Sequence, residues 1–180
     1  MSTLRVNNIT DTSGTAYGYS RMVLTTAQNT TSGTAIDFTG IPSWVKKITV
    51  MLNGVSTNGT SSYLIQLGTG VTPTYVTSGY LGSALRAAAN TTSETVNSSG
   101  FRIVDSIAAA SINHGSVLIA NLTGNTWTEQ GVVCLSNVAS ANMSGGSIAL
   151  SGALTAVRLT TVNGTDTFDA GSVNILYEGY

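Results

Sequence analysis

Residues 47–53 read Lys-Ile-Thr-Val-Met-Leu-Asn, and this stretch decides the fold class. Ile48, Val50 and Leu52 occupy every second position, so their side chains point to the same side of an extended chain. Such alternation is typical of a β-strand with one buried face. The same pattern recurs in residues 63–67 and 172–178, and we therefore expect an all-β protein.

Two further stretches are apolar at consecutive positions. Residues 116–122 read Ser-Val-Leu-Ile-Ala-Asn-Leu, and residues 131–136 read Gly-Val-Val-Cys-Leu-Ser. Apolar side chains on both sides of a strand are typical of a sheet that is covered on both faces. The sequence thus predicts that neither face of these two strands is left bare.

Turn signals separate the strand-like runs. Asn53-Gly54 is one of several, and Asn163-Gly164 predicts a hairpin between residues 158–161 and 165–168, because Asn-Gly accepts the positive φ of tight turns. Residues 81–90 and 107–112 fit either a short helical piece or a loop. Residues 20–180 are expected to form a single β-sandwich or jelly-roll domain of roughly eight to ten antiparallel strands.

The first 19 residues have a different pattern and are expected to form an extended N-terminal arm. Alternating apolar residues are followed by the polar link Asp11-Thr12-Ser13-Gly14-Thr15. Such a segment has too little apolar surface to fold alone, so we expect it to add a strand to its own domain or to reach a neighbouring subunit. The residues assigned to this arm are Leu4, Val6, Ile9, Tyr17 and Tyr19.

The charge balance excludes some classes of partner. Only 8% of the 180 residues are charged and the formal net charge is −1, so there is no basic field for nucleic acid, and copies of the chain repel each other weakly. No apolar run approaches the ~18 residues of a membrane-spanning helix. No signal peptide is recognisable, so we expect synthesis in a cytoplasm. Cys134 is the only cysteine and is interpreted as a small core residue.

Residues that carry chemistry are few. We interpret His114 as a turn residue before Gly115. Asp166 and Asp169 do not have the spacing of the twelve-residue calcium loop, and we interpret them as hairpin carboxylates that accept hydrogen bonds from turn amides. No catalytic residue, metal site or cofactor is expected. A facing pair of carboxylates for glycoside hydrolysis stays open, but no motif supports it.

The aromatic residues offer a binding alternative. Trp44 precedes a strong strand, so we expect it to pack against the core or to cover a strand edge. Trp127 lies beside a turn and is either packed or exposed. With Tyr75 and Tyr80, which lie in Gly-, Ser- and Thr-rich segments, it is a candidate surface contact for a glycan or another protein.

Three parts of the sequence resemble a known family. Residues 34–56, which begin Thr-Ala-Ile-Asp-Phe-Thr-Gly-Ile-Pro-Ser-Trp, resemble a block found in phage tail-fibre and other virion surface proteins. Residues 162–178 are similar to the end of the same type of domain, and residues 1–14 to the first residues of such proteins. The middle, about residues 69–126, matches poorly, and the blocks identify no catalytic or binding residue.

The resemblance implies a phage virion protein, a homotrimeric β-rich module of a tail fibre or short appendage. Its partners would be other virion proteins and a host surface glycan. The chain has no long shaft, so a capsid decoration (cement) protein on the head surface is the competing interpretation. A free carbohydrate-binding module is the alternative from a different class.

Overall fold

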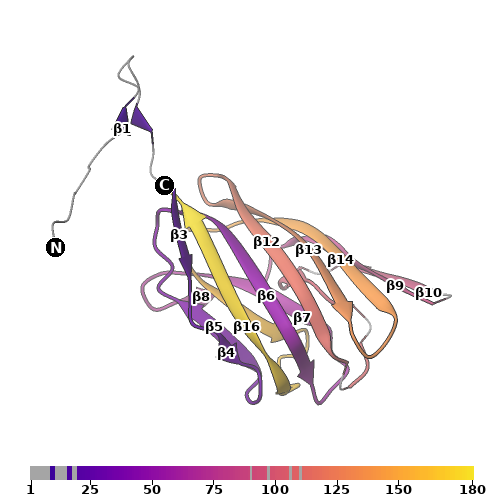
Figure 1. Ribbon diagram of the computed structural model, residues 1–180. Helices are drawn as coiled ribbons and strands as arrows, with labels where there is room; N and C mark the ends of the chain where they lie inside the picture. Colours follow the sequence, from indigo (N-terminus) through magenta and orange to yellow (C-terminus); the bar gives the residue numbers. More distant parts are fainter. Residues whose placement is uncertain are drawn as a thin grey trace.

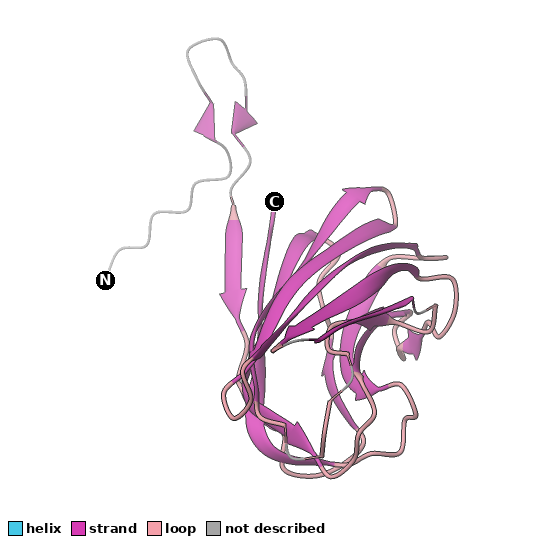
Figure 2. Cartoon of the chain, turned by 90° about the vertical axis from the view of Figure 1, so that its right-hand side faces the viewer, coloured by secondary structure: helices cyan, strands magenta, loops and turns pink. Residues whose placement is uncertain are grey.

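The computed structural model describes residues 9–10, 16–17, 20–89, 91–96, 98–105, 107–109 and 111–180. These residues form strands, turns and loops and contain no helix (Figure 2). Two antiparallel sheets pack on each other around one hydrophobic core. The prediction of an all-β sandwich is therefore confirmed.

The larger sheet has nine strands. They are β3 (Arg21–Leu24), β4 (Gln28–Asn29), β6 (Val45–Thr57), β9 (Leu81–Ala88), β10 (Thr91–Val96), β12 (Asn113–Thr123), β13 (Thr126–Leu135), β14 (Ser140–Ala149) and β16 (Phe168–Gly179). Their order is β10-β9-β14-β13-β12-β6-β16-β3, and β4 also pairs with β16 (Figure 1). We call this the large sheet.

The smaller sheet has five strands. They are β5 (Ala35–Thr39), β7 (Tyr63–Thr69), β8 (Thr74–Tyr75), β11 (Phe101–Arg102) and β15 (Leu154–Thr161). Their order is β11-β7-β15-β5, with β8 beside β7. Two more short strands, β1 (Ile9–Thr10) and β2 (Ala16–Tyr17), pair with each other and, among the described residues, with no strand of either sheet.

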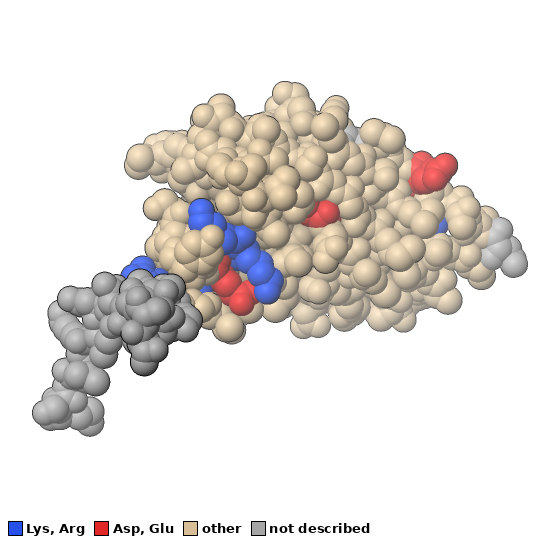
Figure 3. All heavy atoms as spheres, turned by 90° about the horizontal axis from the view of Figure 1, so that it is seen from above, with Lys and Arg blue, Asp and Glu red and all other residues tan. Residues whose placement is uncertain are grey.

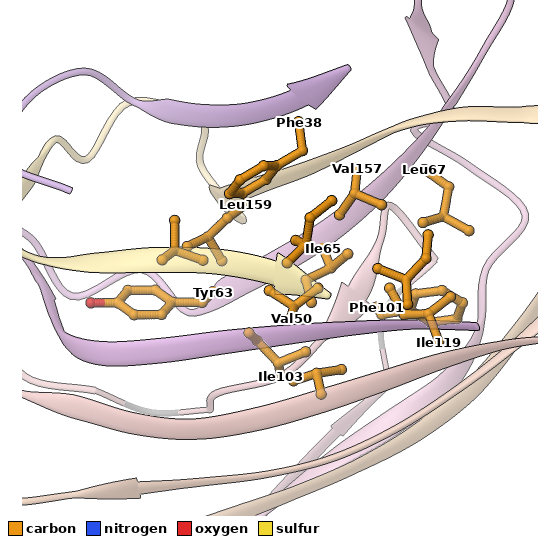
Figure 4. Close-up of a cluster of buried hydrophobic side chains, with 14 of the residues drawn as sticks. Phe38, Val50, Tyr63, Ile65, Leu67, Phe101, Ile103, Ile119, Val157 and Leu159 are labelled. Atoms are coloured by element: carbon orange, nitrogen blue, oxygen red, sulfur yellow. The ribbon is translucent and has the colours of Figure 1, made fainter. Parts of the chain in front are cut away.

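The core lies between the two sheets. Val50 and Ile119 of the large sheet face Ile65 of the small sheet, and all three side chains are at most 1% exposed (Figure 4). The rings of Tyr63 and Phe168 close one part of this layer, with their centroids 5.9 Å apart. The even positions of residues 47–53 therefore point inward, as their alternation predicts.

The small sheet is covered on both faces. Leu64 and Ala156 point away from the core layer and are still only 1% and 0% exposed. Residues 98–100 lie over this second face, where the Gln66 side chain donates a hydrogen bond to the Ser99 carbonyl at 2.9 Å. This cover explains the continuous apolar run of β7.

The large sheet is covered on one face only, which corrects a prediction from the sequence. β12 and β13 contain the two stretches with apolar residues on both sides, yet Leu118 is half-buried and Val132 is 52% exposed. The strand that lies between two layers is β7 instead. The apolar residues on the outer side of β12 and β13 have no partner within the described chain.

Local corrections follow from pairings between distant segments. Asn163-Gly164 does not close a hairpin, because β15 and β16 belong to different sheets. Asn53-Gly54 lies inside β6. Residues 81–88 form β9, since backbone hydrogen bonding to β14 and β10 on both sides outweighs the helical preference of alanine. The described part of the structure has fourteen strands after residue 20, β3 to β16, against the roughly eight to ten that the sequence predicts. Nine strands remain when the two-residue strands β4, β8 and β11 and the two strands of the β9–β10 hairpin are left out.

Gly54 of β6 and Gly171 of β16 meet where the register of the two strands shifts. Both have a positive φ, 68° and 92°. A Cβ atom on Gly171 would overlap the backbone of Gly54. Glycine is therefore required at position 171 by conformation and by close approach together.

We expect Gly171→Ala to be strongly destabilising. The left-handed conformation costs an alanine roughly 1–2 kcal/mol, and a forced backbone shift adds about 1–3 kcal/mol. Gly164→Ala is the matched control, because Gly164 has φ 66° and no atom within 4 Å of its added Cβ, so only the first cost applies. Urea denaturation of both variants measures the difference, and equal losses of stability would contradict the close contact.

Candidate functional site

The outer face of the large sheet is the surface whose side chains point away from the core. It looks toward the viewer in Figure 1. The strand registers place its side chains in rows that cross six strands, β9, β14, β13, β12, β6 and β16. Two adjacent rows describe it.

The first row is largely apolar and consists of Leu85, Met143, Val132, Ser116, Met51 and Asn174. The second row consists of Ser83, Gly145, Gln130, Leu118, Thr49 and Leu176. All twelve residues are exposed or half-buried, and none is ionisable. Met143 and Val132 are cross-strand partners, 49% and 52% exposed, and form an apolar patch at the centre of the face.

Charged groups border these rows and do not enter them. Glu94 of β10 pairs with Leu85 at one end. Toward the other side, Lys47 and Glu178 form an ion pair of 2.7 Å. A shallow depression of about 460 Å³, lined by Leu118, Val132 and Met143 among others, lies between these limits. Charged atoms are also sparse in the view from above in Figure 3.

Two residues offered as possible surface contacts are buried, so a surface role is wrong for Tyr80, and Trp127 has the packed one of its two predicted placements. Trp127 is 4% exposed, because it lies on the inner side of β13 opposite Ile148 of β14. Tyr80 is 2% exposed, and its ring meets Phe101 edge-on with centroids 4.9 Å apart. The Tyr80 hydroxyl oxygen accepts a hydrogen bond from the Leu67 backbone N–H at 2.7 Å. Both aromatic residues stabilise the sandwich.

Tyr75 is half-buried and takes part in a charged cluster on the small sheet. The Arg158 guanidinium lies 3.8 Å from the Tyr75 ring centroid and donates two hydrogen bonds to the Asp37 carboxylate, at 2.7 and 2.8 Å. Burial, with the nearby Asp37 charge, raises the pKa of Tyr75 to about 12. The cluster ties β8 to β15 and β5, which is a structural role.

Trp44 packs as expected. It is partly buried against the core and contacts Tyr177, with ring centroids 5.7 Å apart.

Cys134 and His114 lie in strands, which corrects both interpretations. Cys134 is exposed and has the same orientation on β13 as Val132, so it belongs to the outer face and not to the core. His114 lies in β12, and its Nδ1 atom accepts a hydrogen bond from the Gly54 backbone N–H at 3.2 Å. His114 therefore binds the backbone of β6 where that strand is irregular.

The other sequence candidates do not form a reactive cluster in the described part of the chain. The Asp166 carboxylate accepts a hydrogen bond from the Ser61 backbone N–H at 2.8 Å, and Asp169 accepts one from the Ser56 hydroxyl. No group of three or more His, Cys, Asp or Glu residues within the described ranges is arranged to hold a metal ion. The described residues also include no helix of the length and hydropathy needed to cross a bilayer.

The arm residues are mostly outside the described structure. Leu4, Val6 and Tyr19 lie outside the described residues. Ile9 and Tyr17 are paired with each other in the β1–β2 ladder, and their side chains are not described. The attachment role of the arm stays a prediction.

Glu129 is a buried carboxyl that the sequence analysis does not find. It is 5% exposed and lies on the inner side of β13, in a closed crevice also lined by Tyr80, Phe101 and Arg102. The Ser144 hydroxyl donates a hydrogen bond to it at 2.6 Å. Burial raises the pKa of Glu129 from its usual 4.5 to about 7, although the Ser144 hydrogen bond acts in the opposite direction. Its position inside the alternation Trp127, Glu129, Gly131 is the signal that could have found it.

Comparison of the chain with protein-family models, curated proteins and solved structures finds no match.

We predict that Glu129 makes the protein less stable as the pH rises. Its raised pKa means that the folded chain holds the proton more tightly than the unfolded chain. This contribution is fully present below about pH 4.5 and is lost as the pH rises through about 7, a change of roughly 3 kcal/mol.

The difference in unfolding free energy between the wild type and Glu129→Gln, measured from pH 4.5 to 8, isolates this effect. Glu94→Gln, on the exposed β10 strand, is the control and should leave the pH dependence unchanged. A wild-type minus Glu129→Gln difference that does not vary with pH would contradict the burial of an ionisable carboxyl.

Proposed function

We propose that the chain is a structural protein of a bacteriophage particle, a homotrimeric module on the virion exterior that works through surfaces shared with other subunits. The observation that carries the proposal is that the two main sequence blocks that resemble phage virion surface proteins lie side by side in the fold. Residues 34–56 include β5 and most of β6, and residues 162–178 include most of β16. β6 and β16 are hydrogen-bonded neighbours in the large sheet.

The distribution of charge supports a structural role. Arg158 binds Asp37, and Arg102 lies 2.7 Å from Asp105, so these groups hold loops and strands together. The described residues bring no carboxylate or histidine cluster into an open cleft. A surface with many hydroxyl and amide groups and few charges suits contacts with identical neighbours.

The carbohydrate-binding alternative has lost support. It depended on exposed aromatic rings that could stack on sugars, but Trp127 and Tyr80 are buried, and the Tyr75 ring is occupied by Arg158. Attachment to a tail and attachment to a head remain two locations for the same structural role.

Deletion of residues 1–19 tests the anchoring part of the proposal. We expect the truncated chain to keep the large sheet and the small sheet, because β1 and β2 pair only with each other among the described strands. We also expect it to be absent from purified particles that incorporate the full-length chain. Circular dichroism and thermal unfolding check the fold, and immunoblotting of particles checks incorporation. Truncated protein found on particles at the full-length level would refute anchoring by the arm, and imaging of labelled full-length particles distinguishes tail from head.

A further inference from the structure

We infer that the outer face of the large sheet is the surface through which copies of this chain bind one another. The inference rests on the proposed function, which it deepens by naming the contact surface. Four properties of the described residues carry it: apolar character, position, charge and area.

The first observation is an apolar side that the chain does not cover. β7 has apolar residues on both sides and is covered on both faces of its sheet, whereas β12 and β13 have the same pattern and are covered on one. Leu118, Val132 and Met143 point outward on adjacent strands. Exposed apolar residues that are contiguous, and not scattered singly, mark interaction surfaces.

The position of the patch favours an interface over an edge contact. Val132 and Met143 lie on β13 and β14, which have paired neighbours on both sides, so no backbone hydrogen-bonding group is free there for strand addition. A partner must therefore pack face to face on the side chains. Sheets pack in this way at a separation of about 10 Å, and the core of this same chain is built so.

The charge pattern selects another copy of the chain as the partner. Charges of one sign on a surface attract a partner of the opposite sign and oppose contact with an identical surface. The rows that contain Val132 and Leu118 have no ionisable side chain between Glu94 and the Lys47–Glu178 pair. A neutral face of this kind does not repel an identical face, and the net charge of −1 adds little repulsion.

The area is sufficient for a stable contact. The six strands of the face are each at least eight residues long. With strands about 4.8 Å apart and about 3.3 Å per residue, the whole outer face, including the bordering Lys47–Glu178 pair, covers roughly 25 by 30 Å, or about 750 Å². A standard interface takes about 800 Å² from each partner.

Cys134 provides the test, because it is the only cysteine and lies exposed on this face. In the full-length assembled chain, we expect a maleimide to modify Cys134 at least about tenfold more slowly than in a chain carrying Val132→Glu, since only the dissociated fraction reacts. The negative charge of the new carboxylate should by itself slow the reaction of the Cys134 thiol with maleimide. Faster labelling of the Val132→Glu variant therefore reports greater exposure of Cys134. Intact mass spectrometry follows the labelling, and light scattering gives the oligomer mass.

Val71→Glu is the matched control. Val71 is fully exposed in the turn between β7 and β8, away from the outer face, so the same change there should alter neither the oligomer mass nor the labelling rate. Dilution of the wild type is a second measurement that needs no substitution. Labelling should accelerate as the chain dissociates, which keeps the test valid if Val132→Glu fails to fold.

The outcomes separate this inference from the proposed function. A trimer with protected Cys134 that Val132→Glu dissociates supports both, and a dimer with the same behaviour supports the face but contradicts the homotrimer. A trimer in which Cys134 reacts freely refutes the outer face as the contact surface but agrees with the proposed homotrimer. A wild-type monomer refutes both the outer face as a contact surface and the homotrimer. The measurement of incorporation into particles, with and without the N-terminal arm, then still tests the proposed role in the virion.

Discussion

The register between β6 and β16 is the constraint on which the rest of the structure depends. Because side chains alternate along a strand, a shift of β16 by one residue against β6 would send Ile175 out of the core and bring Leu176 into it. The close backbone contact of Gly54 with Gly171 holds this register where the two strands become irregular. These strands lie far apart in the sequence, so their pairing closes a long loop.

The sequence was sufficient for features that depend on local pattern. The all-β class and the inward positions of Ile48, Val50 and Leu52 follow from period-two alternation alone. Features that depend on distant pairing could not be read in the same way. β9 contains alanine and leucine in a helix-like pattern, yet it is held as a strand by β14 and β10. The apparent turn at Asn53-Gly54 is likewise a strand irregularity opposite Gly171.

The candidate site shows the same division. That β12 and β13 are apolar on both sides was visible in the sequence, but which of their faces the chain itself covers was not. Trp127 and Tyr80 could not be assigned to the core without the register of β13 with β14 and the docking of Tyr80 on β7. Glu129 was overlooked because one carboxyl in a strand has no motif. Its meaning comes from burial, which raises its pKa.

The scarcity of charge links the fold to the proposed assembly. A chain with 8% charged residues uses its ion pairs mainly to tie strands and loops together, and the two rows at the centre of the outer face contain no charged side chain. In a monomer, that face would gain nothing from the outward Leu118, Val132 and Met143, and strands of one-sided sheets ordinarily carry polar residues there. Apolar residues on that side become favourable only when another surface removes them from water. The apolar outer side of β12 and β13 is thus the pattern that the proposed assembly of several chains would require.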